Sequence, residues 1–269
     1  MKTELLTEHD VHRAAELLRS GGLVGIPTET VYGLGANGFD PEAVANIFRA
    51  KGRPQDNPLI LHIPEPGWLE RCCQDIPAAA WTLAERFWPG PMTMILPRKP
   101  LVPDVVTAGL DTVGMRCPAH PLCRAIIAAA DVPIAAPSGN TSGRPSPTTA
   151  GHMLEDMDGK IEMILDGGQV GIGVESTIVD VSGDVPTLLR PGAITMEMLR
   201  ETVGRVEIDP AIQAPPSADL RPKAPGMKYR HYAPKASLTI VEGEQEKVTA
   251  KINELLKEGE AADEKIGVI

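Results

Sequence analysis

Two cations flank a glycine in the segment KGRPQDNPL, between a predicted helix and a predicted apolar strand. Lys51 and Arg53 lie in a loop stiffened by two prolines, so they could hold a di- or triphosphate as a rigid clamp. The same pair could instead end the helix and complement its dipole. His62 ends the apolar strand and could orient a substrate, although a single histidine at such a position is often structural.

A second candidate site is the loop APSGNTSGRPS at residues 136–146, which crowds hydroxyl and amide side chains after a short apolar strand. Ligands of α/β sheets bind beyond the carboxyl ends of strands, which favours a binding loop over an ordinary turn. Arg116 and Arg190 also end predicted strands. These cations have no matching carboxylate cluster that would hold a metal by itself, but a triphosphate could bring Mg²⁺.

Other chemistry-bearing motifs are absent from the sequence or poorly placed. It contains no Walker loop G-x-x-x-x-G-K-[ST], no G-x-S-x-G elbow and no H-E-x-x-H. Gly33, Gly35 and Gly38 superficially match a dinucleotide fingerprint. They lie in a long predicted loop, PTETVYGLGANG, rather than directly between a strand and a helix, so we expect a shaped loop and not NAD binding.

The composition limits the class of protein. The chain has 269 residues, enough for one large domain or two, and a net charge of −10 argues against a broadly basic nucleic-acid-binding surface. The four cysteines have no zinc or disulfide spacing and are best read as small buried hydrophobes. The N-terminus is too polar for a secretory signal, and no apolar stretch approaches ~20 residues. We expect a cytoplasmic protein with no membrane partner.

Alternating helical and extended patterns predict an α/β or α+β sheet domain. A capping pattern at Thr7 to Asp10 begins the first helix, and Asp40-Pro41 begins the second. Further helices are predicted at residues 78–87, 122–130, 150–157 and 196–203. Strands are predicted at residues 23–26, 59–63, 92–96, 113–116, 134–136, 163–165, 176–181 and 187–189.

The character of the chain changes after residue 209. Residues 210–236 contain six prolines and carry a net charge of +4, so they predict a basic linker that either is a solvated tether or folds over an anionic ligand. Residues 237–269 read as strand, helix and strand, at 237–241, 246–256 and 266–269. One such unit buries little core, so we expect it to begin a second domain that continues past Ile269.

These blocks, in their order, resemble the YrdC/Sua5 family of threonylcarbamoyl-AMP synthases. Lys51, Arg53, Ser138 and Asn140 match its K-x-R…S-x-N signature, and PTETVYGLG, NPLILHI, WPGPMTMIL, TVGMRCP, ESTIVD and LLRPG are similar to other family blocks. The segment PGMKYRHYAP resembles the linker of the longer Sua5 form. The resemblance implies a YrdC-like twisted mixed sheet at 1–209, the linker at 210–236 and the start of a Rossmann-like domain at 237–269.

The activity that this resemblance implies is nucleotidyl transfer. L-Threonine, bicarbonate and ATP, with Mg²⁺, would give threonylcarbamoyl-AMP and pyrophosphate, and the product would pass to the tRNA threonylcarbamoyl transferase machinery for modification of adenosine 37. The constellation of cations suits this reaction, because carboxylates and phosphates must be neutralised together.

The resemblance also implies roles for individual residues. Lys51 and Arg53 would be catalytic. The ATP side would comprise Arg53, Asn57, Thr112, Ser138, Asn140, Ser146, Arg190 and Tyr232, with Arg230 and His231 as further lid candidates. The threonine pocket would comprise Thr30, Tyr32, His62, Arg116 and Ser176, with Arg116 pairing the carboxylate of the amino acid.

Three alternatives stay open on the sequence. The cations could hold a tRNA or double-stranded RNA backbone without turnover. The segment GLGANG could bind NAD in a dehydrogenase, in which case a substitution at Gly35 would abolish NAD binding. The third alternative is closer in chemistry: a carbamoyltransferase that acts on another acceptor. Assays with amino acids other than threonine would distinguish it from a threonine-specific enzyme.

Overall fold

The computed structural model describes residues 2–212, 222–225 and 237–268. The chain divides into two compact units, Met1–Ala233 and Pro234–Ile269. Within the described residues, none of the helices is both long and apolar enough to cross a membrane.

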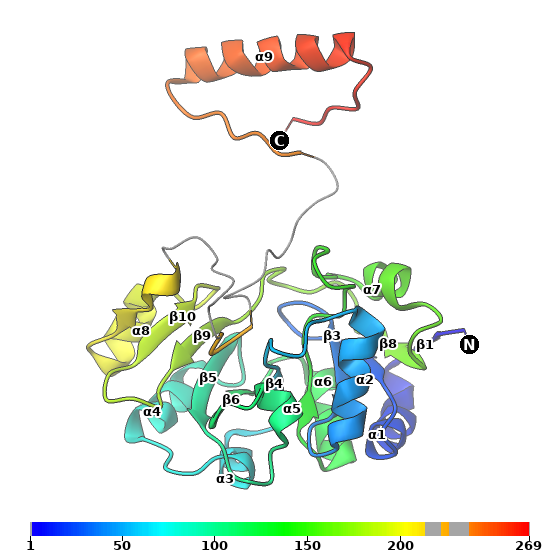
Figure 1. Cartoon of the computed structure of the whole chain (residues 1–269), viewed down its shortest axis with the longest axis vertical. Helices are drawn as coiled ribbons and strands as arrows, with labels where there is room; N and C mark the ends of the chain where they lie inside the picture. Colours follow the sequence, from blue (N-terminus) through cyan, green and yellow to red (C-terminus); the bar gives the residue numbers. More distant parts are fainter. Residues whose placement is uncertain (1, 213–221, 226–236, 269) are drawn as a thin grey trace. The chain divides into compact units, whose positions relative to one another are not determined.

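The first unit is built on one twisted mixed sheet, shown in Figure 1. In the described residues it has eleven strands in the order β1-β8-β2-β3-β7-β4-β6-β5-β9-β10-β11, with both parallel and antiparallel pairs. The strands are β1 Glu4–Leu6, β2 Val24–Ile26, β3 Gly33–Asn37, β4 Ile60–His62, β5 Met92–Pro97, β6 Thr112–Arg116, β7 Ile134–Ala135, β8 Met163–Leu165, β9 Thr177–Asp180, β10 Thr187–Arg190 and β11 Glu207–Ile208.

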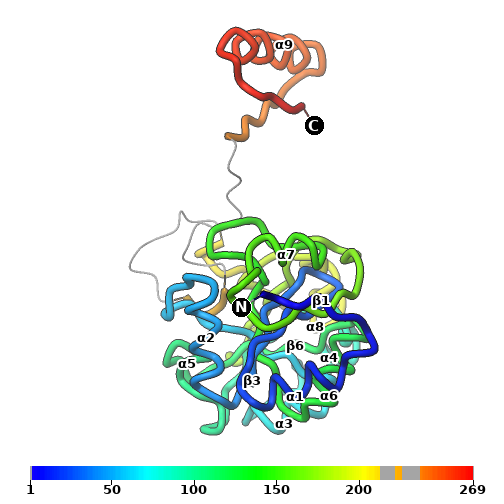
Figure 2. Tube along the Cα trace, turned by 90° about the vertical axis from the view of Figure 1, so that its right-hand side faces the viewer, coloured from blue at the N-terminus to red at the C-terminus, as the bar shows by residue number. Residues whose placement is uncertain are grey.

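Helices pack on the sheet in two groups, which Figures 1 and 2 show from two sides. Helices α1 and α6 pack together over the strands near β2, while α2 packs on β3 and α4 packs with α8. The helices of this unit are α1 Val11–Arg19, α2 Pro41–Lys51, α3 Leu69–Cys72, α4 Ala78–Phe87, α5 Asp104–Thr107, α6 Pro121–Ala130, α7 Ala150–Met157 and α8 Met196–Val203, with short 3₁₀ turns at Glu8–Asp10, Pro66–Trp68 and Pro210–Ile212.

Successive side chains of the central strands point alternately to the two faces of the sheet. Helices cover one face, and the other face carries the site. Leu61, Met94 and Val179 join the main core under the helices, whereas their neighbours Ile60 and Ile95 belong to a smaller cluster. Because successive strand side chains point to opposite faces, this second cluster lies on the other side of the sheet. It also includes Ile178, Leu189 and the fully buried Ala224.

Local sequence signals explain where α2 begins and ends, which matters because Lys51 is its last residue. The Asp40 carboxylate accepts hydrogen bonds from the backbone N–H groups of Glu42 and Ala43, and proline occupies the first turn. Gly52 then adopts a left-handed conformation with φ of 61°, which glycine tolerates without steric cost. The sequence prediction of this helix is confirmed.

One predicted loop contains a strand. The segment GLGAN, placed in a long polar loop by the sequence, forms β3 between β2 and β7. A Cβ atom on Gly35 would lie 2.9 Å from Ile134 Cγ2, and one on Gly38 would lie 2.5 Å from Leu61 Cδ2. These glycines therefore allow close packing inside the sheet, and the dinucleotide interpretation has no strand-to-helix turn to support it.

The second unit confirms its predicted helix but not its predicted strands. Helix α9 spans Gln245–Ala261, longer than the predicted 246–256. In the described parts of its flanks, residues 237–242 and 264–268, the backbone forms no strand. A strand needs a hydrogen-bonding partner, and apolar alternation alone does not supply one.

All four cysteines are buried and free, as their spacing indicates. Burial raises the pKa of the Cys117 thiol to about 11 and that of Cys72 to about 12. The cysteines therefore act as small core residues and not as nucleophiles or metal ligands.

Candidate active site

A cleft with charged and hydroxyl side chains in its lining lies over the central strands. Its walls come from the loop after β2, the loop after α2, the ends of β4, β6 and β10, the loop after β7, the segment before β9 and Pro225. The polar lining residues are Thr28, Thr30, Arg53, His62, Arg116, Ser138, Glu175, Ser176 and Arg190, and the carbonyl-bearing Pro225 closes one side.

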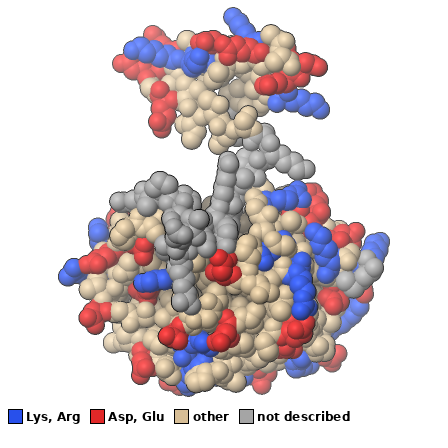
Figure 3. All heavy atoms as spheres, in the orientation of Figure 1, with Lys and Arg blue, Asp and Glu red and all other residues tan. Residues whose placement is uncertain are grey.

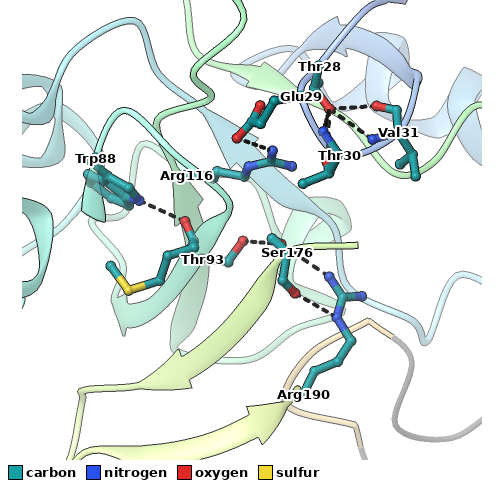
Figure 4. A network of polar contacts seen from close by, with 10 residues as sticks. Thr28, Glu29, Thr30, Val31, Trp88, Thr93, Arg116, Ser176 and Arg190 are labelled. Carbon is teal, nitrogen blue, oxygen red and sulfur yellow. Dashed lines mark hydrogen bonds and ion pairs between the residues drawn. The ribbon is translucent and has the colours of Figure 1, made fainter. Parts of the chain in front are cut away.

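A row of polar side chains crosses adjacent strands at the floor of this cleft (Figure 4). His62 of β4 pairs in register with Arg116 of β6, and Arg116 pairs with Thr93 of β5. The Thr93 hydroxyl lies 2.8 Å from the Ser176 hydroxyl. Arg190 of β10 then donates from Nε to the Ser176 carbonyl at 3.0 Å and from Nη2 to its hydroxyl at 3.2 Å. Strand register thus aligns residues that are distant in the chain.

The loop after β2 is held by its own hydroxyl groups. Thr28 Oγ1 donates to the Val31 carbonyl at 2.6 Å and accepts from the backbone N–H groups of Thr30 and Val31 at 3.2 Å (Figure 4). From the other side, the N–H groups of Ile172 and Gly173 donate to the carbonyls of Glu29 and Thr30, both at 3.0 Å. This loop is therefore fixed before any ligand binds.

Arg116 forms an ion pair that the sequence interpretation did not include. Its Nη2 lies 2.8 Å from Glu29 Oε1, and both side chains are largely buried. Arg116 therefore already has an anionic neighbour at the cleft.

His62 is a neutral residue in this environment. Burial, and secondly the charge of Arg116, lower the pKa of its imidazole to about 3. Its Nδ1 lies 3.2 Å from the Ile60 carbonyl. Because a carbonyl only accepts, the proton of the neutral ring belongs on Nδ1, which leaves Nε2 as an acceptor.

Lys51 does not line the cleft, unlike its predicted clamp partner Arg53. Its ammonium is buried and donates to the main-chain carbonyls of Ser138, at 2.5 Å, and Asn140. Burial, with the charges of Arg53 and Lys160, holds the pKa of Lys51 well below its usual range. The residue therefore fixes the loop after β7 rather than reaching into the cleft.

Arg53 lines the cleft and organises its own loop. Its guanidinium donates to the carbonyls of Asn57, at 3.3 Å from Nη2, and Pro58, at 3.1 Å. Asn57 is buried, and its Oδ1 accepts no hydrogen bond from the described residues. The loop after α2 therefore holds one guanidinium at the cleft and one unsatisfied amide oxygen beside it.

The loop after β7 is built from tight contacts. A Cβ on Gly139 would lie 2.6 Å from Met153 Sδ, so the glycine lets this loop pack closely against the Met153 side chain of α7. Asn140 is buried, and its Nδ2 donates to the carbonyls of Thr141 and Arg144. Ser138 lines the cleft, while the Ser146 hydroxyl contacts Glu175 Oε1 at its edge.

Six predicted site residues in the described part of the chain are not among those that line the cleft: Tyr32, Lys51, Asn57, Thr112, Asn140 and Ser146. Tyr32 is fully buried, and its hydroxyl donates to the Gly168 carbonyl at 2.6 Å, so it supports the loop after β8 instead of lining a threonine pocket. Thr112 begins β6, about 13 Å along the strand from Arg116. Its side chain is not among those that line the cleft. Tyr232, Arg230 and His231 lie outside the described residues.

The sequence reasoning missed Thr28, Glu29, Thr93, Glu175 and Pro225. Thr28 and Glu29 belong to PTETVYGLG, where two hydroxyl groups and a carboxylate follow a predicted strand. This signal could have identified them, but the prediction named only Thr30 and Tyr32 from this segment. Glu175 precedes Ser176 in ESTIVD. Thr93 and Pro225 carry no local signal, because strand register and linker packing bring them to the site.

The described residues hold no group of three or more His, Cys, Asp or Glu side chains that could bind a metal ion. Glu175 is the carboxylate that lines the cleft in the part of the chain that the structure describes.

Comparisons with known proteins show the family to which the chain belongs. The model of the Sua5, YciO and YrdC family, described as "Telomere recombination", matches residues 16–192. The model described as "Threonylcarbamoyl-AMP synthase, C-terminal domain" matches residues 194–269. The chain belongs to the Sua5 family of threonylcarbamoyl-AMP synthases.

Two relatives within the Sua5 family cover nearly the whole chain. The threonylcarbamoyl-AMP synthase of Pyrococcus abyssi is 52% identical over 99% of this chain and 78% of its own length. That of Bacillus subtilis is 48% identical over 99% of this chain and 76% of its own length. The crystal structure of P. abyssi Sua5 complexed with L-threonine has a TM-score of 0.94 at 49% identity, covering 99% of this chain and 80% of that one. The family resemblance and the predicted YrdC-type fold are confirmed.

Proposed function

We propose that this chain is an L-threonylcarbamoyladenylate synthase, a nucleotidyltransferase that converts L-threonine, bicarbonate and ATP to threonylcarbamoyl-AMP and pyrophosphate. This is the first step in forming N6-threonylcarbamoyladenosine at position 37 of tRNA. The near 50% identity to threonylcarbamoyl-AMP synthases over 99% of the chain supports the activity.

The observation that carries the residue roles is the meeting of three guanidinium groups at one cleft. Arg53, Arg116 and Arg190 come from distant parts of the chain and all line it. The reactants are a carboxylate, bicarbonate and a triphosphate, which repel one another in water. Fixed cations in a partly buried cleft neutralise this repulsion and hold the reactants together.

The chemistry needs two bond-forming steps. The threonine nitrogen attacks the carbon of bicarbonate, and the departing hydroxide leaves as water with a proton from the amine. An oxygen of the resulting carbamate attacks the α-phosphorus of ATP, and the bond to pyrophosphate breaks. Positioning and charge neutralisation serve both steps, and a covalent enzyme intermediate is not required.

The threonine side of the cleft would be formed by Thr30, His62, Arg116 and Ser176. Arg116 would pair the substrate carboxylate through the part of its guanidinium that does not face Glu29. Neutral His62 presents Nε2 as an acceptor, which suits the hydroxyl proton of threonine. This arrangement would favour a hydroxylated amino acid.

The nucleotide would lie on the side of Arg53, Asn57, Ser138 and Arg190. The buried Oδ1 atoms of Asn57 and Asn140 accept no hydrogen bond from the described residues, so they are available to amino or hydroxyl donors of a ligand. Ser146 would contribute at the edge. Mg²⁺ would enter with the triphosphate, whose oxygens it prefers, and Tyr232 would close over the nucleotide from the linker.

The product would be passed to the transferase machinery that modifies tRNA, in the cytoplasm. Direct RNA binding without turnover is less well supported, because Figure 3 shows Lys and Arg side chains interspersed with Asp and Glu on the face drawn. Phosphodiester backbones are held by continuous basic surfaces.

Pyrophosphate release from MgATP tests the activity. Release should require both L-threonine and bicarbonate and should be weaker with L-serine, and mass spectrometry should detect threonylcarbamoyl-AMP. Release with an unrelated amino acid but not with threonine would point to another acceptor. Binding of RNA with a steep salt dependence and no pyrophosphate release would favour the binding module.

A further inference from the structure

The ion pair of Glu29 and Arg116 is unusual because it is buried yet poorly hydrogen bonded. The side chains of Glu29 and Arg116 are 15% and 5% exposed, and their charged atoms approach to 2.8 Å (Figure 4). Neither carboxylate oxygen of Glu29 accepts a hydrogen bond from the described residues, and Nε and Nη2 of Arg116 donate none. All four atoms are shielded from solvent.

Such an arrangement is costly for a protein unless a ligand completes it. Buried charges are normally satisfied by several hydrogen bonds as well as by their partner, and each missing bond leaves a desolvated polar group. The pair lies at the cleft, since Arg116 and both sequence neighbours of Glu29 line it. The four unsatisfied atoms therefore point to a ligand that offers both hydrogen-bond donors and acceptors.

The position of the Glu29 carboxylate is fixed by the fold. Thr28 Oγ1 closes the loop on one side of it, and the N–H of Ile172 binds the Glu29 carbonyl at 3.0 Å on the other. Arg116 is held on β6 between β4 and β5. Both charges are thus presented by rigid backbone, as a binding site for a small charged molecule requires.

An α-amino acid matches this pair. It carries a carboxylate and an ammonium on the same carbon, so a zwitterion that directs its carboxylate to Arg116 brings its ammonium within a few ångströms of the same guanidinium. The nearby anion is Glu29, whose Oε1 lies 2.8 Å from Arg116 Nη2 and whose Oε2 has no hydrogen-bond partner among the described residues, so Oε2 can accept from the ammonium. We propose that Glu29 binds the amino group of L-threonine, and so selects a substrate with a free α-amine and holds its nitrogen for attack on bicarbonate.

This inference rests on the proposed function, because it assigns a role toward the threonine substrate of that reaction. It makes Glu29 a specificity-determining residue beside the pocket of Thr30, His62, Arg116 and Ser176. A purely structural role for Glu29 would affect every ligand of the cleft equally. An amine-binding role would affect only ligands that carry the amine.

Equilibrium binding to the full chain, without turnover, separates these cases. L-Threonine and 3-hydroxybutanoate, which is threonine without its amino group, are titrated into wild type and Glu29→Gln by calorimetry. In wild type, threonine should bind about 10- to 100-fold more tightly than the analogue, the range for a hydrogen-bonded charged group. In Glu29→Gln this ratio should fall close to one, while Glu29→Asp should retain part of it.

Glu42→Gln is the control, because Glu42 is an exposed carboxylate that pairs with Arg49 outside the cleft lining and should leave the ratio unchanged. Thermal unfolding and ATP binding check that each variant is folded. An unchanged ratio in Glu29→Gln, or tighter threonine binding because a competing anion has gone, would overturn the inference. Wild type that does not bind threonine at all would instead count against the proposed function.

Discussion

The ammonium of Lys51 donates a hydrogen bond to the main-chain carbonyl of Ser138, 2.5 Å away, and a second one to the carbonyl of Asn140. The end of α2 is thereby joined to the loop after β7, and Ser142 N–H returns a bond to the Lys51 carbonyl at 2.9 Å. The two halves of the K-x-R…S-x-N signature are therefore one structural unit. Lys51 acts through the loop, while Arg53 and Ser138 face the cleft.

Replacing Lys51 should lower both activity and stability. Lys51→Met leaves two main-chain carbonyls without their donor, at a cost of about 1–3 kcal/mol for each buried group left unsatisfied. We expect the melting temperature to fall and adenylation to drop at least ~100-fold as the loop after β7 shifts. Arg49→Met on the same helix should change neither, since Arg49 pairs with Glu42 at the surface. Wild-type stability in Lys51→Met would contradict this role.

Arg190 should matter for the binding of threonine and of ATP. Its guanidinium donates to the Ser176 carbonyl, the Ser176 hydroxyl and the Pro225 carbonyl, at 3.0, 3.2 and 3.3 Å. Lysine keeps the charge but not the planar fork. Steady-state kinetics of Arg190→Lys should show KM values for threonine and ATP raised about tenfold, a loss of roughly 1.4 kcal/mol. Arg205→Lys, an exposed position, is the control, and equal KM values in both variants would refute the assignment.

Much of the fold could be predicted because its signals are local. Caps and apolar periodicity predict α4, α7 and α8 with the bounds that the structure shows, and β8 likewise. The strand β3 could not be predicted, because glycine-rich GLGAN has weak strand propensity and becomes a strand only between β2 and β7. Tertiary pairing therefore decides this strand, and the short elements β1, α3, α5 and β11 were likewise not predicted.

In the candidate site too, residues with a local sequence signal were predicted, and residues placed by tertiary contacts were not. Arg53, Arg116, Ser138 and Arg190 were found because charged and hydroxyl groups at element ends carry a visible signal. The partners of these residues were not found, because Thr93 reaches Ser176 by strand register and Glu29 reaches Arg116 across the fold. The spacing of Lys51 and Arg53 in the sequence also cannot show that their roles differ. The Lys51 ammonium binds a main-chain carbonyl, whereas Arg53 lines the cleft.

The linker is attached to the catalytic unit through Ala224. This side chain is fully buried among Ile60, Ile95, Ile178 and Leu189, next to the cleft residue Pro225. Ala224→Leu should overpack the cluster, cost about 1–3 kcal/mol and raise the KM for ATP, because Pro225 would be displaced from Arg190. Lys223→Ala removes only a half-exposed ion pair with Asp180 and should have little effect. Thermal unfolding and kinetics of the two variants check this, and the prediction fails if they behave alike.

His62 should make the protein sensitive to acid. Its folded-state pKa of about 3 lies below the usual value of 6.5, so the unfolded chain binds the proton more tightly. The stability that neutral His62 contributes is complete above pH 6.5 and is lost as the pH falls toward 3, by up to about 1.4 kcal/mol per pH unit. Carboxylates also lose stability in acid, so the variant must be compared with wild type.

His62→Gln keeps a neutral polar side chain and should flatten the slope of unfolding free energy against pH between pH 6.5 and 4.5, measured by urea denaturation. His9→Gln, at an exposed position, should retain the wild-type slope. The same slope in all three proteins would show that His62 takes up its proton without opposing the fold.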